Sequence, residues 1–198
     1  MSEAAKLEND SSGPIEAILL VGDLNKHGLA TKDFTLPIED TDWETMKTTM
    51  IEVITAIKTN FPNVPILPVI GNNDVVYHDQ APTSDIKQKY YEELWDIMFK
   101  NVTANAEIAA NTTIEATWMA GGYYVYELGD DTMILNLNGM YPFYENIEEP
   151  QIAEEMILWV DEVLTKNTDK NWITQTHVFF GNNYFDSLEI LWNETYTN

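Results

Sequence analysis

The chain of 198 residues contains no cysteine and is poor in positive charge. Without cysteine it has no disulfide, no thiolate nucleophile and no cysteine-ligated zinc site. Only 10 Lys and Arg residues stand against 33 Asp and Glu residues, which gives a formal net charge of −23. Because such a field repels nucleic acids and anionic membrane surfaces, we expect neither as a direct partner. The acid excess is typical of a solubilising surface, with a dedicated cation-binding face as the alternative.

Long apolar runs are missing as well. The sequence has no stretch of 18 apolar residues, so it predicts no transmembrane segment. Residues 1–14 lack the apolar h-region of a signal peptide and are predicted to be a loose segment. In contrast, 44% hydrophobic residues, with six Trp, ten Tyr and seven Phe, indicate a folded domain over residues 15–198. The acceptor pattern Asn-X-Ser/Thr predicts N-glycosylation, a hint of secretory origin, at Asn101, Asn111 and Asn193.

The order of the predicted elements indicates an α/β fold. Residues 15–21 and 66–70 are short apolar runs typical of buried strands. Between them, apolar residues recur at three- and four-residue steps, which predicts a helix from about residue 40 to residue 60 with Ile51 on its apolar face. A strand–helix–strand unit of this kind makes its two strands parallel.

The remaining elements are predicted from the same signals. Residues 101–118 are Asn-, Thr- and Ala-rich and fit either a helix or a loop. The other predicted elements are a helix over 84–99 capped by Ser84, a hairpin over 121–138, a helix over 150–164 and a strand over 172–178.

Polar side chains follow both predicted parallel strands, each time after a glycine. Asp23 follows Gly22, and residues 72–74, Asn-Asn-Asp, follow Gly71. Because parallel strands present their carboxyl ends at the same sheet edge, we expect these side chains to face one another across a crevice. Each motif alone also fits a turn in which short polar side chains bond the local backbone.

The other polar and aromatic residues belong to no motif that indicates a function by itself. His177, near the end of the last predicted strand, fits a buried core histidine when taken alone. His78 belongs to no motif and is assigned to the surface. Tyr141 and Tyr144 fit either the lining of a groove or simple packing.

Taken in order, Gly22-Asp23, Gly71-Asn72-Asn73-Asp74 and Thr176-His177 resemble the motifs of the calcineurin-like metallophosphoesterases. The acid sphingomyelinase-like phosphodiesterase branch is the part of this superfamily that the chain resembles most, through residues 22–27, 61–72, 121–124, 134–138 and 159–177. The resemblance implies an α/β/β/α sandwich whose two-metal centre hydrolyses phosphoric diesters. It also implies a small phosphodiester or a lipid headgroup as substrate. The implied location is extracellular or lysosomal, with the cytoplasm as the alternative because the sequence predicts no signal peptide.

The resemblance assigns roles to individual positions. Asp23 corresponds to the carboxylate that bridges two metals, and Asn72 and His177 correspond to ligands of the second metal, for which zinc is the expected ion. His27 and Asn138 correspond to residues near the substrate phosphate. Asp74 corresponds to a group that orients a ligand.

Several family features have no counterpart in the sequence. The family's first strand, with its Asp-X-His motif, and its C-terminal Gly-His-X-His motif are not found here, so we expect at most one well-held ion. Asn73 replaces the motif histidine, and an amide cannot transfer a proton near neutral pH. We therefore expect a weak or inactive diesterase, with a non-catalytic secreted glycoprotein or binding module on the same fold as the alternative.

Overall fold

A computed structural model describes residues 13–143 and 145–178 of the chain. Most of the predicted loose segment, together with Tyr144 and Asn193, lies outside the described residues. The elements, in chain order, are β1 (Ile18–Leu20), η1 (Ile38–Asp40), α2 (Trp43–Asn60), β2 (Ile66–Pro68), α3 (Lys87–Trp95), η2 (Asp96–Lys100), η3 (Thr103–Asn105), α4 (Ala106–Ala109), α5 (Thr112–Gly121), β3 (Tyr124–Leu128), β4 (Thr132–Asn136), α6 (Gln151–Lys166) and β5 (Asn171–Gln175).

The strands form two separate sheets. β1 pairs with β2 in parallel, with Ile18 opposite Ile66, so the predicted strand–helix–strand unit is confirmed. β3 and β4 form the predicted antiparallel hairpin, and β5 adds to β4 in parallel. Two hydrogen bonds join the sheets, one from the hydroxyl of Tyr124 to the carbonyl of Pro68 (2.9 Å) and one from Nε2 of Gln175 to the carbonyl of Leu67 (2.8 Å).

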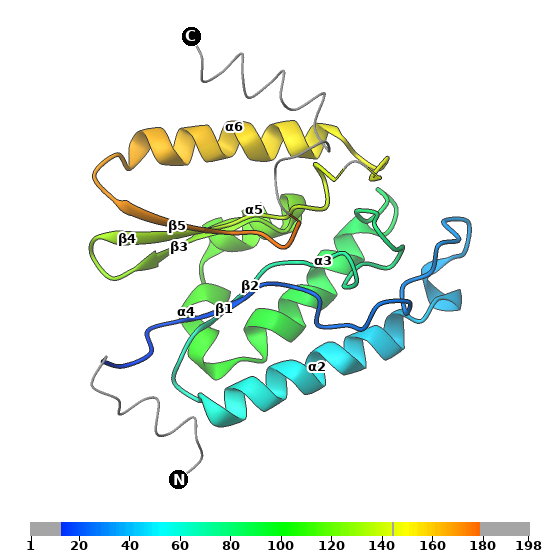
Figure 1. Ribbon diagram of the computed structural model, residues 1–198, viewed down its shortest axis with the longest axis horizontal. Helices are drawn as coiled ribbons and strands as arrows, with labels where there is room; N and C mark the ends of the chain where they lie inside the picture. Colours follow the sequence, from blue (N-terminus) through cyan, green and yellow to red (C-terminus); the bar gives the residue numbers. More distant parts are fainter. Residues whose placement is uncertain (1–12, 144, 179–198) are drawn as a thin grey trace.

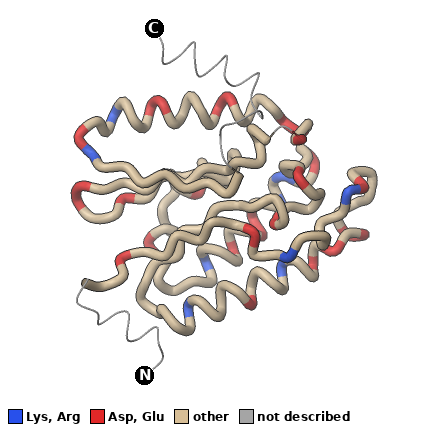
Figure 2. Tube along the Cα trace, viewed as in Figure 1, with Lys and Arg blue, Asp and Glu red and all other residues tan. Residues whose placement is uncertain are grey.

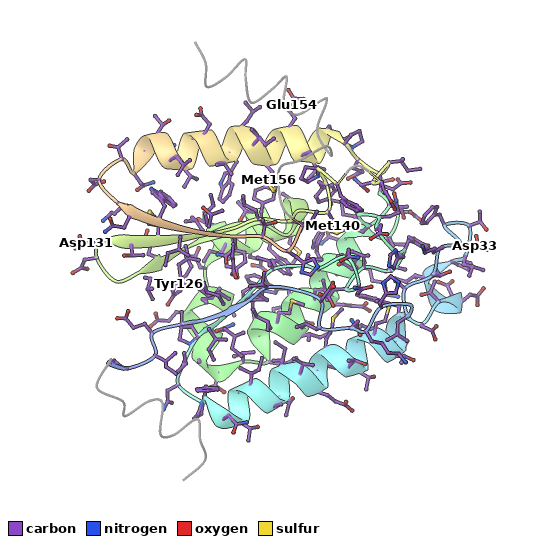
Figure 3. The ribbon with its side chains drawn as sticks, in the orientation of Figure 1. Asp33, Tyr126, Asp131, Met140, Glu154 and Met156 are labelled. Atoms are coloured by element: carbon purple, nitrogen blue, oxygen red, sulfur yellow. The ribbon has the colours of Figure 1, made fainter. Side chains whose placement is uncertain are left out.

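Helices cover the outer face of each sheet, which confirms the predicted α/β class. In Figure 1, α6 lies along one side of β3–β4–β5, α2 lies beyond β1 and β2 on the opposite side, and α3 overlaps β1 and β2 in this view. Met156 on α6 is buried among Tyr123, Leu135 and Leu137, so this helix packs on the outer face of the hairpin sheet. Figure 3 shows Met156 on the side of α6 that faces the sheet and Glu154 on the other side.

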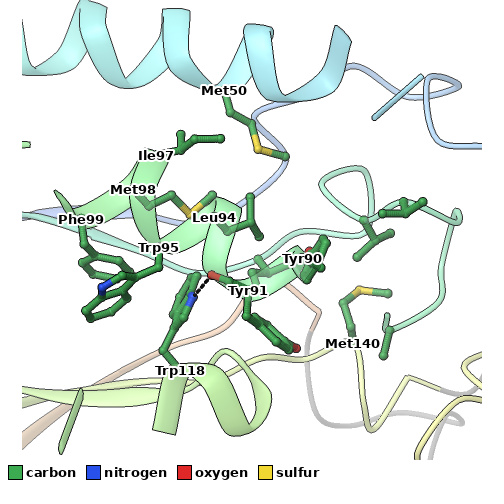
Figure 4. Close-up of a cluster of buried hydrophobic side chains, with 14 of the residues drawn as sticks. Met50, Tyr90, Tyr91, Leu94, Trp95, Ile97, Met98, Phe99, Trp118 and Met140 are labelled. Atoms are coloured by element: carbon green, nitrogen blue, oxygen red, sulfur yellow. Dashed lines mark hydrogen bonds between the residues drawn. The ribbon is translucent and has the colours of Figure 1, made fainter. Parts of the chain in front are cut away.

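The core that α3, η2 and α5 share with the two sheets is strongly aromatic. Trp95 and Trp118 are fully buried, with ring centroids 6.1 Å apart, and Phe99 packs edge-on against Trp118. Figure 4 shows this cluster and the hydrogen bond from Nε1 of Trp118 to the carbonyl of Tyr91, 3.0 Å long. Each aromatic side chain that leaves water in this way contributes on the order of 2 kcal/mol, so this cluster anchors the scaffold that holds the strand ends.

The structure corrects two local predictions. Ser84 does not cap a helix, because it lies in a turn closed by hydrogen bonds to the carbonyl of Thr83, and α3 begins only at Lys87. Ile51 is 48% exposed rather than part of the buried face of α2, since this helix packs against α3 and η2 with a narrower stripe than the periodicity suggested.

The undecided stretch 101–118 is mostly helical. It contains η3, α4 and most of α5, whose first turn is capped by the side-chain oxygen of Asn111.

Acidic side chains are distributed over the surface. Figure 2 shows Asp and Glu along α6 and around the β3–β4 turn, whereas α2 carries both Glu and Lys. Within the described ranges, none of the helices combines the length and the apolar composition needed to cross a membrane.

Candidate metal centre

The ends of β1 and β2 meet, as the sequence predicted, and two glycines make the contact possible. A Cβ atom on Gly71 would lie 2.2 Å from the backbone nitrogen of Asp23, and one on Gly22 would lie 2.6 Å from the nitrogen of Gly71. Gly22 also has a φ of 69°, which favours glycine. The two polar loops therefore touch through their backbones.

Asp23 lies at the centre of this contact, and residues from two later segments reach its carboxylate. Oδ1 accepts a hydrogen bond from the backbone nitrogen of Asn73 (2.9 Å), and Oδ2 accepts one from Nδ2 of the same residue (2.7 Å). Nε2 of His177 lies 3.2 Å from Oδ2. The Asp23 side chain is 30% exposed, so solvent and ligands reach it.

His177 presents a defined ring nitrogen to the crevice. Its Nδ1 lies 2.7 Å from the carbonyl oxygen of Val21, which only accepts hydrogen bonds, so the ring proton belongs on Nδ1. Nε2 then faces two oxygens, Oδ1 of Asn72 at 3.0 Å and Oδ2 of Asp23 at 3.2 Å. In a neutral ring this nitrogen carries a lone pair.

The orientation of the Asn72 amide follows from its second contact. Its Nδ2 donates to Oδ1 of Asp79 at 3.0 Å, which places the amide oxygen on the side of His177. An imidazole nitrogen, a carboxylate oxygen and an amide oxygen thus converge. These three atoms are all acceptors, and acceptors this close to one another repel. Either a second proton on His177 or a cation bound between them removes the repulsion.

This donor set fits a divalent cation. Ligand atoms about 2.0–2.2 Å from a tetrahedral zinc ion lie roughly 3.3–3.6 Å from one another, a few tenths of an ångström wider than the 3.0 and 3.2 Å separations. The part of the chain that the structure describes holds no cluster of three or more His, Cys, Asp or Glu side chains suited to a metal. The candidate centre therefore depends on the amide oxygen of Asn72 as its third ligand.

Asp74 lies beneath the crevice rather than in it. It is fully buried and accepts hydrogen bonds from the backbone nitrogens of Asn25 (3.0 Å) and Gly71 (3.1 Å). Burial raises the pKa of Asp74, and these donors offset part of the rise. Its carboxylate ties the loop after β1 to the turn after β2, so it positions both walls of the crevice.

The structure contradicts the assignment of His78 to the surface. His78 is 5% exposed, and its Nε2 lies 3.3 Å from Nδ1 of His27, one of the residues predicted near a phosphate. The isolated bridge between Thr31 and Tyr77, with the hydrogen bond from the His78 nitrogen to the Thr31 carbonyl (2.8 Å), brings the two loops together. No sequence signal marks this pairing, because the two histidines lie on loops without a regular pattern.

The remaining predicted site residues lie elsewhere. Asn138 is buried, donates to the carbonyl of Gly121 (3.0 Å) and the hydroxyl of Tyr91 (3.2 Å), and accepts from the nitrogen of Met140 (3.0 Å), so its amide is engaged within the core. Tyr141 is also buried and bonds Tyr91, which makes it a packing residue. Asn101 and Asn111 are exposed.

Comparison with known proteins shows a partial relationship. Over 111 residues the chain is 32% identical to "Sphingomyelinase phosphodiesterase C" of Dictyostelium discoideum, an alignment that covers 54% of this chain and 22% of that protein. The chain thus spans about a fifth of the length of this curated relative. No family model matches the chain. The similarity agrees with the resemblance to the acid sphingomyelinase-like branch over about half of the chain.

Proposed function

We propose that the chain carries part of a metallophosphodiesterase site in which Asp23, Asn72 and His177 hold one divalent cation, most favourably zinc. The observation that carries this proposal is that Asn72 Oδ1 and Asp23 Oδ2 lie 3.0 and 3.2 Å from His177 Nε2, with the His177 proton directed away to Val21. The name of the Dictyostelium relative supports a phosphoric diester as the substrate class. A small diester or a lipid headgroup is the substrate we expect.

A cation held at this position supplies Lewis-acid polarisation of a phosphoryl oxygen. The residues of the chain contribute orientation. Asp79 holds the Asn72 amide with its oxygen toward the centre, and the Val21 carbonyl holds the His177 ring. Such partners of ligand residues typically change metal affinity by about 10- to 100-fold when removed.

Asn73 limits the rate of the proposed reaction. Its Nδ2 donates to Asp23 Oδ2 at 2.7 Å, so the side chain stabilises the carboxylate, but an amide supplies no proton to a leaving group. We therefore propose slow hydrolysis. The same observation favours, as a second candidate, a non-catalytic module that binds the cation and a phosphate ester without turnover.

The test measures zinc binding before activity. Isothermal titration of the purified full chain is expected to give one bound zinc ion, with affinity lowered at least about 10- to 100-fold in His177→Gln and Asp23→Asn, since loss of a ligand costs no less than loss of a ligand's partner. Glu16→Gln is a matched control, because it removes one negative charge at an exposed position outside the crevice. Equal affinities in all four proteins would contradict the proposed centre.

Turnover then separates the two candidates. Zinc-dependent hydrolysis of bis-p-nitrophenyl phosphate that disappears in Asp23→Asn supports the diesterase. Zinc binding with no turnover above that of the Asp23→Asn protein supports the binding module.

A further inference from the structure

His78 is buried between a carboxylate and a second histidine. Its Nδ1 lies 2.5 Å from Oδ2 of Asp79, although the contact lacks the direction of a good hydrogen bond, and its Nε2 lies 3.3 Å from Nδ1 of His27. The two rings meet edge to face, with centroids 4.9 Å apart. The His78 side chain is 5% exposed, whereas His27 is an exposed residue. A buried imidazole thus connects Asp79 to an imidazole at the surface.

The contacts determine where the ring protons lie. A lone pair on His78 Nδ1 would repel the Asp79 oxygen at 2.5 Å, so this nitrogen carries the proton. In a neutral His78 ring, Nε2 then accepts, and the hydrogen bond between the histidines requires His27 to donate from Nδ1. The remaining nitrogen of His27, Nε2, is left with its lone pair.

Asp79 is itself held in place. Its Oδ1 accepts from the Asn72 amide at 3.0 Å while Oδ2 contacts His78, so one carboxylate serves both the proposed metal centre and the histidine pair. Its φ of 63° lies in the left-handed region, a conformation that an aspartate keeps only when its surroundings fix it. The carboxylate is therefore a rigid link between the two.

We propose that His78, anchored by Asp79, is a positioning residue that holds His27 with its proton on Nδ1 and so assigns Nε2 of His27 to proton transfer. This inference rests on the proposed diesterase function. His27 would supply the proton that Asn73 cannot. For this step His27 first takes a proton from solvent on Nε2 and becomes an imidazolium. When the P–O bond to the leaving group breaks, its electron pair stays on the leaving oxygen, which takes that proton from His27 Nε2. A water molecule forms the new P–O bond and releases one proton to solvent, so the proton that His27 took up is returned.

The link also accommodates the charge that this step requires. A His27 ring that has gained a proton on Nε2 still donates from Nδ1 to His78, and His78 still donates from Nδ1 toward Asp79. The positive charge on His27 is therefore linked, through the ring of His78, to the nearby Asp79 carboxylate. An aromatic ring without nitrogen at position 78 would break the path.

The primary test reads the tautomers directly and needs no substrate. The chain has three histidines, so long-range ¹H–¹⁵N spectra of the ¹⁵N-labelled protein resolve each ring. At pH 8, where imidazoles are ordinarily neutral, we expect the His27 proton on Nδ1 in the native protein. In His78→Phe we expect it on Nε2, the usual preference of an exposed ring.

A conservative variant distinguishes hydrogen bonding by residue 78 from simple filling of space by its side chain. In His78→Gln the amide oxygen takes the place of Nε2 and accepts from His27, so the Nδ1 proton of His27 is expected to remain. A native protein whose His27 proton lies on Nε2 overturns the proposal, whether or not the variants fold. An unchanged His27 tautomer in folded His78→Phe overturns it as well.

Activity gives the second readout. His78→Phe is expected to slow hydrolysis of a diester with an alkyl leaving group about 10- to 100-fold, and to affect a p-nitrophenyl diester much less, because p-nitrophenolate leaves without a proton. His78→Gln is expected to recover most of the loss. Equal losses for both leaving groups contradict proton transfer through His27. If no diester is hydrolysed while the His27 tautomer depends on residue 78, the proposed function fails and the positioning by His78 stands.

Discussion

Substitution of Gly71 by alanine tests whether the contact between the two strand ends is as close as the structure shows. The added Cβ would lie 2.2 Å from the backbone nitrogen of Asp23 and 2.3 Å from its Oδ1, where ordinary contacts are 3.4–4 Å. The Asp23 loop must therefore retreat by about 1 Å, and since the atom in the way belongs to the backbone, no side-chain rotation relieves it.

The expected cost lies at the upper end of overpacking effects, about 3 kcal/mol in the free energy of unfolding. Gly129→Ala is the matched control. Gly129 has a φ of 65° and no heavy atom within 4 Å of its ideal Cβ, so alanine there costs only the strain of a left-handed conformation, about 1 kcal/mol.

Urea unfolding followed by tryptophan fluorescence measures both variants. With a slope of about 2 kcal/mol per molar urea, the midpoint should fall by about 1.5 M in Gly71→Ala and by about 0.5 M in Gly129→Ala. Equal shifts in the two variants would refute the close approach of the strand ends, and with it the placement of Asp23 against Asn73.

Three further predictions follow from other parts of the structure. Asn105→Ala should destabilise the protein by about 3 kcal/mol, because the Asn105 side chain bonds both the nitrogen (2.9 Å) and the carbonyl (2.8 Å) of Ile66. The exposed control Asn101→Ala should cost less than about 0.5 kcal/mol. The same urea assay measures both variants. Burial raises the pKa of Tyr90, Tyr91 and Tyr124 well above 10, so the stability that these phenols contribute is complete below pH 10 and is lost as the pH rises further. Their absorbance at 295 nm should therefore change only together with the far-UV circular dichroism. Ionisation of all ten tyrosines in a folded protein would contradict their burial. Secretion from insect cells should attach glycans at Asn101 and Asn111, which are exposed, with the Asn111 oxygen still capping α5; mass spectrometry that finds both peptides unmodified would contradict this.

Local patterns in the sequence were sufficient for most of the elements. The apolar residues of α2 and α6 recur with the helical period, and Gly129 with its neighbours separates two runs rich in apolar and aromatic residues that pair as β3 and β4. These patterns involve residues only a few positions apart in the sequence, so they predict secondary structure without knowledge of the fold. The prediction that Ser84 caps a helix was wrong for the same reason. Hydrogen bonds to the carbonyl of Thr83, rather than the capping preference of serine, decide where α3 begins.

The candidate site was determined by the sequence only in part. The rule that parallel strands present their carboxyl ends at one edge was enough to bring Asp23 to Asn72 and Asn73, since both motifs directly follow a strand. The contact of His177 with Val21, across 156 positions, required the second sheet to pack on the first, and the pairing of His27 with His78 required two irregular loops to meet at Thr31. Such contacts depend on how whole layers pack and not on local periodicity, so only the tertiary structure decided that His177 Nε2 faces the crevice and that His78 contacts His27.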